Sequence, residues 1–409
     1  MLQSIFFSMP LFVCGILSVE LALSLLRWQS PARRWLLAWA LTATVLYGGH
    51  LVFFHRLTAW LPLSDSLYVA ANLAVYPLYL IYIYRLTRRR VPRWMVAVLA
   101  VPVVAGVVTG VLYGVMDAEE TRTFVERYLY EGTTEGLRGV AMTQAVVHTV
   151  CKVLFAAGVL TTVGLGIRQI RRYNRLVESL YADTEHKTLE GVHVVLVLLV
   201  ATSVVSIVAN AIGRAWFADS VWLTAIPSAV FSALLFALGW QGLCQMFSIE
   251  DIAAEEDEGT ATALQHSGQP AMGLEPSGRT AGVATVLPHG ETAAEATKGV
   301  LPSAGLPPLP SHLRPRLERL MQEERIFTQP DLKLDDLANM LGTNRTYLLR
   351  CMKEEMGMSF SEYINRHRIA YARRLHEENP KLLKSEVAQM VGYSSMSSFY
   401  RNLHSYDGA

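Results

Sequence analysis

Charged residues are scarce in this chain. Asp, Glu, Lys and Arg make up 17% of its 409 residues, against about 25% in an average soluble domain. Hydrophobic residues make up 52%, and the mean hydropathy is +0.27. The composition therefore excludes a purely soluble protein and a wholly disordered one. The formal net charge is +1, so overall electrostatics indicates no binding partner.

Cysteines and catalytic motifs are sparse as well. The four cysteines are far apart and show no C-x-x-C spacing, which argues against a disulfide framework or a zinc site and favours buried thiols; they are Cys14, Cys151, Cys244 and Cys351. The chain carries no motif of an ion pump or an intramembrane protease. No nucleotide-binding domain accompanies a histidine, which excludes a kinase. We expect no enzyme, no metal and no cofactor.

The charges that are present divide the chain into three parts. Residues 1–248 form an apolar block, which we interpret as a membrane domain. Residues 249–311 are acidic, rich in Ala, Gly and Pro, and free of aromatic residues. Such a segment buries too little apolar surface to fold alone and is predicted to be a flexible linker. Residues 312–409 form a charged block with 15 basic and 13 acidic residues, typical of a soluble domain.

Apolar runs near twenty residues long recur seven times in the first part. Each is long enough to cross a hydrocarbon core of about 30 Å as a helix. The predicted spans are 4–26, 35–54, 67–84, 94–116, 144–167, 190–212 and 221–246. The sequence therefore predicts a seven-helix transmembrane bundle.

The connecting loops predict the orientation of this bundle. The loops after the first, third and fifth spans contain thirteen Lys and Arg residues, and the loops on the other side contain five. Basic loops stay in the cytoplasm. We therefore expect a multi-pass protein of a bacterial inner membrane, with its N-terminus outside and its C-terminal domain in the cytoplasm.

Several polar side chains fall inside the predicted spans, where they are costly and hence candidates for function. The candidate ligand or sensor residues are Glu20, His50, His148 and Lys152. His148 and Lys152 are four residues apart and so share one helix face. We expect Glu20 and Lys152 to pair inside the bundle and line a ligand cavity. The alternative interpretation is that these groups make packing hydrogen bonds or reach the membrane surface.

The C-terminal block contains an internal repeat. Residues 344–353 align with 395–404 at an offset of 51, and each copy follows a short amphipathic helix that ends near a glycine, at Gly342 and Gly392. A helix, a turn with glycine and a capped second helix are the signature of a helix-turn-helix. Between the copies, a capping box at Ser359–Glu362 begins a long helix that runs to about Glu377. Four arginines lie off the apolar stripe of this helix: Arg366, Arg368, Arg373 and Arg374.

The second helix of each copy supplies the candidate DNA contacts. Recognition helices place their N-terminal residues against base edges, where Arg reads guanine and Ser or Thr contacts bases or phosphates. The candidates are Arg345, Thr346, Tyr347 and Arg350 in the first copy, and Met396, Ser397, Ser398 and Arg401 in the second.

The block also resembles the AraC-type DNA-binding domain over about residues 315–409. The motifs that carry the resemblance are Leu337-Ala338, Gly357-Met358-Ser359-Phe360, Tyr363-Ile364, Arg368-Ile369, Ala372, Glu386-Val387-Ala388, Val391-Gly392-Tyr393 and Ser398-Phe399-Tyr400-Arg401. The resemblance implies two helix-turn-helix units joined by a long helix. Leu403-His404 departs from the Phe-Lys that usually stands there in the family.

Together these patterns predict an all-α, membrane-tethered transcription regulator that couples a signal to promoter binding. The expected partners are double-stranded DNA, membrane lipid, a small-molecule or membrane signal, a second copy of the chain and, for an activator, RNA polymerase. Two alternatives remain. A transporter or channel with a regulatory DNA-binding tail would need a continuous polar path, and a membrane enzyme would need paired catalytic groups at one depth.

Overall fold

The structure is a computed structural model that describes residues 2–27, 29–185, 187–194, 196–197, 200, 203, 221–245, 247–254 and 309–406. These residues are helical apart from turns, loops and one isolated β-bridge, which confirms the all-α prediction. They fall into two compact units. The first contains the described residues within 2–170 and 190–254, and the second contains those within 171–189 and 309–406.

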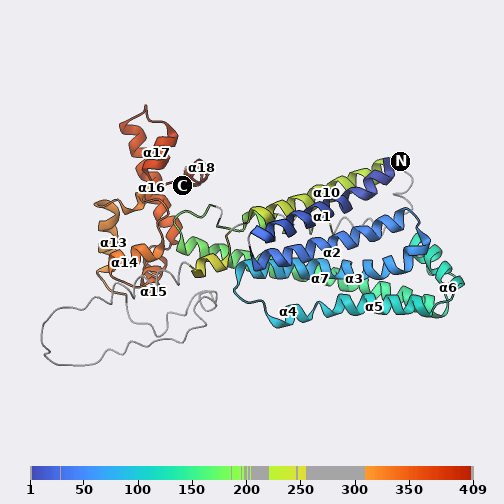
Figure 1. The fold of residues 1–409 in the computed structure, drawn as a ribbon. Helices are drawn as coiled ribbons and strands as arrows, with labels where there is room; N and C mark the ends of the chain where they lie inside the picture. Colours follow the sequence, from blue (N-terminus) through green and yellow to red (C-terminus); the bar gives the residue numbers. More distant parts are fainter. Residues whose placement is uncertain are drawn as a thin grey trace, which may run out of the picture. The chain divides into compact units, whose positions relative to one another are not determined.

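Long helices dominate the first unit. They are α1 (Leu2–Arg27), α2 (Pro31–Phe54), α3 (Leu61–Thr87), α5 (Ala100–Val115), α10 (Val221–Cys244) and α7 (Gly139–Leu180), the last of which continues into the second unit. Shorter elements connect them: η1 (Thr58–Trp60), α4 (Arg93–Ala97), α6 (Ala118–Thr123) and the π-helical η2 (Phe124–Tyr130). α1 packs against α2 and α10, and α3 packs against α2 and α5, as the neighbouring ribbons in Figure 1 show.

The first unit is apolar on its outside as well as inside. α3 is its most buried helix, with Tyr79 and Ile81 almost completely covered. On α5, by contrast, Val103, Val107 and Val111 are each about 60% exposed and follow one another at a helical spacing of four. Long apolar stripes on the surface are unusual for a protein that folds in water, and they are what lipid-facing helices present.

Six helical segments of the described residues are long and apolar enough to cross a membrane. They are Ser4–Arg27, Pro31–Phe54, Thr58–Thr87, Arg93–Val115, Gly139–Leu180 and Ala225–Ala254. They overlap six of the seven predicted spans. The remaining span, 190–212, lies largely outside the described residues, as does most of the predicted linker, so the count of seven stays a prediction.

The helices α3 and α7 extend furthest beyond their predicted limits. α3 begins six residues before the expected start at 67, and α7 continues through the basic residues that we assigned to a loop after 167, ending at Leu180. The described residues that follow, 181–185 and 187–189, belong to the same compact unit as the C-terminal helices.

The second unit is a small helical domain. It contains α13 (Leu313–Gln322), η3 (Ile326–Thr328), α14 (Leu334–Leu341), α15 (Arg345–Arg350), the π-helical η4 (Cys351–Glu355), α16 (Phe360–Glu378), α17 (Lys384–Met390) and α18 (Met396–Tyr406). α16 is the predicted long helix, and its N-cap Ser359 accepts a hydrogen bond from the Glu362 amide at 3.2 Å. The helix pairs α14–α15 and α17–α18 flank it in the sequence.

Candidate nucleic-acid interface

The first helix-turn-helix is built by local caps around an apolar seam. The carboxylate of Asp336 accepts the Lys333 amide at 3.0 Å and so caps α14. Gly342 ends that helix in the left-handed conformation, with φ of 64°. Asn344 then caps α15 by accepting the Tyr347 amide at 2.9 Å. Leu337, Ala338, Leu341 and Leu348 are buried between the helices.

The second helix-turn-helix repeats this construction. Glu386 accepts the Leu383 amide at 2.9 Å at the start of α17, and Ser395 accepts the Ser398 amide at 3.1 Å at the start of α18. Its core combines residues from α16, α17, α18 and the turn between the last two helices. It consists of Ile369, Ala372, Leu375, Val387, Ala388, Val391, Tyr393 and Phe399.

The four candidate DNA contacts on α15 differ in their surroundings. Thr346 is exposed and Tyr347 is half-buried. The guanidinium of Arg345 lies 3.8 Å from the Asp335 carboxylate, and Arg350 donates to Glu354 at 3.3 Å from its Nε atom. DNA phosphates or bases would compete with these two carboxylates for the arginines.

On α18, the exposed residues lie at positions that share one helix face. Ser397 and Arg401 are exposed, and Tyr400 and His404 are exposed beside them at spacings of three and four. We call these four residues the reading face of α18. Tyr400 and His404 are not among the candidate contacts expected from the sequence. The helical spacing of Phe399 and Leu403, which face the core, was the signal that could have placed them on the opposite, exposed side.

The other two candidates on α18 point elsewhere in this arrangement. Met396 packs against the core of the second helix-turn-helix. Ser398 is 3% exposed, and its hydroxyl donates to the carboxylate of Asp183 at 2.9 Å. Their assignment as DNA contacts stays a prediction. Ser398 could contact DNA only after its hydrogen bond with Asp183 is broken.

Arg368 differs from the other arginines of α16 because it is completely buried. Its Nε donates to the Phe327 carbonyl and its Nη2 to the Gln329 carbonyl, both at 2.7 Å. The guanidinium carbon lies 5.2 Å from the centre of the Tyr393 ring. The resemblance motif Arg368-Ile369 is therefore a packing feature, which ties the η3 turn to α16 and to the second helix-turn-helix.

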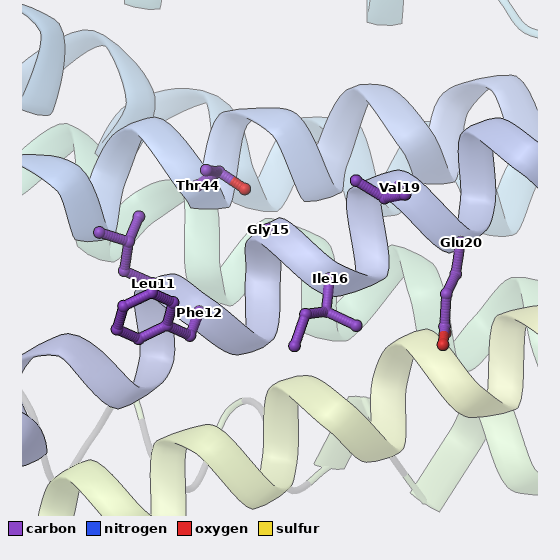
Figure 2. A pocket seen from close by; sticks show the side chains of 7 residues that line it. All are labelled: Leu11, Phe12, Gly15, Ile16, Val19, Glu20 and Thr44. Atoms are coloured by element: carbon purple, nitrogen blue, oxygen red, sulfur yellow. The ribbon is translucent and has the colours of Figure 1, made fainter.

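In the first unit, Glu20 and Lys152 do not form the expected pair. Glu20 is exposed on α1, beside an open hollow of about 470 Å³ lined by Phe12, Ile16, Thr44 and their neighbours (Figure 2). The Lys152 ammonium lies 5.3 Å from the centre of the Tyr128 ring. α1 packs chiefly against α2 and α10.

Two of the candidate polar groups make buried or half-buried contacts. His148 Nε2 lies 2.8 Å from the Asp65 carboxylate, and its Nδ1 lies 3.0 Å from the Gln144 carbonyl oxygen. Tyr113 donates its hydroxyl to the same Asp65 oxygen at 2.9 Å. His50 Nε2 lies 3.4 Å from the Tyr68 hydroxyl. Asp65 was not among the candidate residues because it precedes the predicted third span by two residues.

Comparison with known proteins agrees with the geometry of the second unit. Residues 337–408 match a family described as a helix-turn-helix domain. An 80-residue segment is 32% identical to the HTH-type transcriptional regulator YtdP of Bacillus subtilis, covering 20% of this chain and 10% of that protein. A 77-residue segment is 32% identical to the Msm operon regulatory protein of Streptococcus mutans, covering 19% and 27%.

A further 80-residue segment is 30% identical to the probable transcription factor PqrA of Proteus vulgaris, covering 19% of this chain and 64% of that protein. The match thus spans less than two thirds of each of these relatives. No solved structure matches the chain. The C-terminal part is a helix-turn-helix domain similar to those of transcription regulators, and the apolar unit has no counterpart in these matches.

Proposed function

We propose, from the helix-turn-helix domain at residues 337–408 and the apolar unit that precedes it, that this protein is a membrane-tethered transcription regulator. The observation that carries the proposal is the reading face of α18. Ser397, Arg401 and their two neighbours project from a recognition-type helix whose opposite side is fixed in a core. Such a helix enters the major groove of double-stranded DNA.

The apolar surface of the first unit supports the membrane part of the proposal. A stripe such as Val103, Val107 and Val111 would be unfavourable in water. In a bilayer it contacts acyl chains at no such cost. Following the distribution of basic residues, the N-terminus lies outside an inner membrane and the DNA-binding domain lies in the cytoplasm.

The role of the membrane unit in this proposal is to respond to a small-molecule or membrane signal. A signal that binds one arrangement of helices more tightly shifts the population toward it. The shift would change how the DNA-binding domains are presented or paired with those of a second copy. An activator of this kind would also contact RNA polymerase.

A DNA selection with the full chain in detergent tests the proposal. Sheared genomic DNA is incubated with the wild type, Arg401→Ala and Arg374→Ala at one fixed salt concentration, because salt alone changes such affinities by orders of magnitude. Arg374 is the matched control, an exposed arginine on α16 rather than on the reading face. We expect a recurring DNA motif with the wild type and Arg374→Ala that weakens or disappears with Arg401→Ala. Equal, motif-free retention by all three proteins would refute sequence-specific binding.

Protease protection tests the orientation. In spheroplasts, added protease should leave a C-terminal tag intact until the membrane is permeabilised. Loss of the tag in sealed spheroplasts would contradict a cytoplasmic DNA-binding domain.

A further inference from the structure

A short segment from the first half of the sequence is buried in the DNA-binding unit. Residues Tyr181–Glu185, which we call the docking segment, directly follow the last residue of α7. Tyr181, Ala182 and Asp183 are each no more than 5% exposed. They fall in a predicted loop of the membrane domain, but they belong to the same compact unit as residues 309–406.

The backbone of the docking segment is held by the two residues that immediately precede α14 and by α16. Tyr181 forms an antiparallel bridge with Lys333, and the Ala182 amide donates to the Leu332 carbonyl at 3.1 Å. On its other side, the Ala182 carbonyl accepts from Ser361 Oγ at 3.0 Å and from Asn365 Nδ2 at 2.8 Å. These contacts satisfy the backbone groups of a residue that water does not reach.

The acidic side chains of the docking segment bind the start of α18. One oxygen of Asp183 accepts the Ser398 hydroxyl at 2.9 Å, and the other accepts the Ser394 hydroxyl at 2.8 Å. Glu185 accepts a hydrogen bond from the Ser395 hydroxyl. A carboxylate at a helix N-terminus is also favoured by the helix dipole.

Asp183 is adapted to this place as an anion. Burial pushes the pKa of its carboxyl upward, but hydrogen bonds from the Glu185 amide, Ser394 and Ser398, with the charge of Arg368, more than offset that effect. The pKa is lowered overall, so the carboxylate form is the one that docks.

The docking segment thus touches three elements whose mutual placement determines DNA reading. It contacts the residues before α14, the middle element α16 and the start of α18, while the reading face of α18 stays exposed. Two recognition helices that enter successive major grooves must stand about 34 Å apart. A connection that bridges both helix-turn-helix units restricts this spacing without covering the surface that reads DNA.

We infer that the docking segment is an intramolecular clamp that sets the spacing of the two recognition helices, with Asp183 as its positioning residue. The inference rests on the proposed function. Because the segment continues α7, it attaches the DNA-binding domain to the membrane unit at a second place besides the covalent connection to α13.

Hydrogen exchange on the full chain in detergent tests the docking. The variants are Asp183→Ala, the nearly isosteric Asp183→Asn, and Thr184→Ala as a control that leaves the acidic contacts in place. Loss of a hydrogen bond to a charged group corresponds to roughly tenfold or more in the docking equilibrium. We expect exchange near residues 181–183 and 394–399 to quicken by about that factor in both Asp183 variants and not in Thr184→Ala.

DNA spacing tests the positioning role, which mere destabilisation would not mimic. The selected DNA motif is compared with a version in which two base pairs are inserted between the half-sites read by α15 and α18. The wild type should bind the inserted site much more weakly, and the Asp183 variants should lose most of this discrimination. A variant that is only less stable would bind both sites less well by the same factor.

Each outcome of these experiments is decisive. Unchanged exchange in the Asp183 variants overturns the docking, and faster exchange with full spacing discrimination overturns the positioning role. Tighter DNA binding by the variants would show an inhibitor in place of a clamp and would also overturn it. A wild type that selects no DNA motif refutes the proposed function, and this role with it, even if exchange shows the segment docked.

Discussion

The replacement Arg368→Ala probes the interior of the DNA-binding unit most directly. The guanidinium is completely buried and donates to the carbonyls of Phe327 and Gln329, both at 2.7 Å. Burial lowers its pKa, while Tyr393, Asp183 and Asp331 act in the opposite direction. An arginine remains charged at neutral pH even so, and alanine would leave both carbonyls without these donors.

The expected loss follows from the two hydrogen bonds. At about 1.5–3 kcal/mol for each bond to a charged group, the unit should lose roughly 3 kcal/mol or more. That is a large share of the 5–15 kcal/mol by which a typical domain is stable. It corresponds to a rise of about 100-fold in the opening equilibrium.

Hydrogen exchange of the α16 amides in the full chain measures this change. Tryptophan fluorescence would not, because all eight tryptophans lie before residue 241. Arg366→Ala is the matched control, since Arg366 is an exposed arginine of the same helix. If exchange in α16 quickens no more in Arg368→Ala than in Arg366→Ala, the reasoning about the buried guanidinium is refuted.

Four further predictions follow from single sites. Gly392→Ala should destabilise the second helix-turn-helix by about 2 kcal/mol or more, since φ is 93° and a Cβ atom would lie 2.6 Å from the Thr328 carbonyl oxygen. The control is Gly357→Ala, because Gly357 has a φ of 71° and open space around it. Hydrogen exchange in α17 should be faster in Gly392→Ala than in this control. Cys351 should resist maleimide at pH 8 until the protein is denatured, because burial, and to a smaller extent Glu355, raises the pKa of its thiol to about 11. Rapid labelling of Cys351 in the native protein, detected by mass spectrometry, would contradict this. Docking by Asp183 should persist as the pH falls to 3.8, the ordinary pKa of an aspartate, and be lost only below it, because the pKa of the docked carboxyl is lowered and the carboxylate is the bound form. Hydrogen exchange of the docking segment measured against pH, with Asp183→Asn as the pH-insensitive control, checks this direction. His148→Ala should lower the thermal midpoint of the first unit, followed by tryptophan fluorescence, more than the double variant with Asp65→Ala does, because it leaves the buried Asp65 carboxylate with the Tyr113 hydroxyl but without the imidazole. Equal or greater loss in the double variant would argue against an ion pair.

Local patterns predicted most of the helices because the forces that form them act over a few residues. The caps at Asn344, Ser359 and Ser395 accept amides three residues ahead. Leu337 and Leu341, four residues apart on α14, and Leu348 on α15 are buried as expected. The limits of α3 and α7 were missed because polar residues inside a helix resemble a loop when only hydropathy is considered.

The candidate sites were predicted less completely because side-chain partners are chosen across the fold. Glu20 and Lys152 are both suited to a buried pair, yet Glu20 is exposed on α1 and Lys152 lies over the Tyr128 ring. His148 instead meets Asp65, 83 residues away in the sequence. A sequence indicates which groups are costly to bury, but the packing of helices selects the groups that compensate them.

The sequence by itself determined that this chain has an apolar part and a helix-turn-helix part, since composition and period depend on neighbouring residues alone. It also determined the caps, turns and core faces of the helix-turn-helix units. Only the tertiary structure decided that Arg368 holds an internal turn, 41 residues away, and that Asp183 binds Ser398, 215 residues away. Neither contact leaves a local pattern, because each depends on where distant backbone segments come to lie when apolar surface is buried.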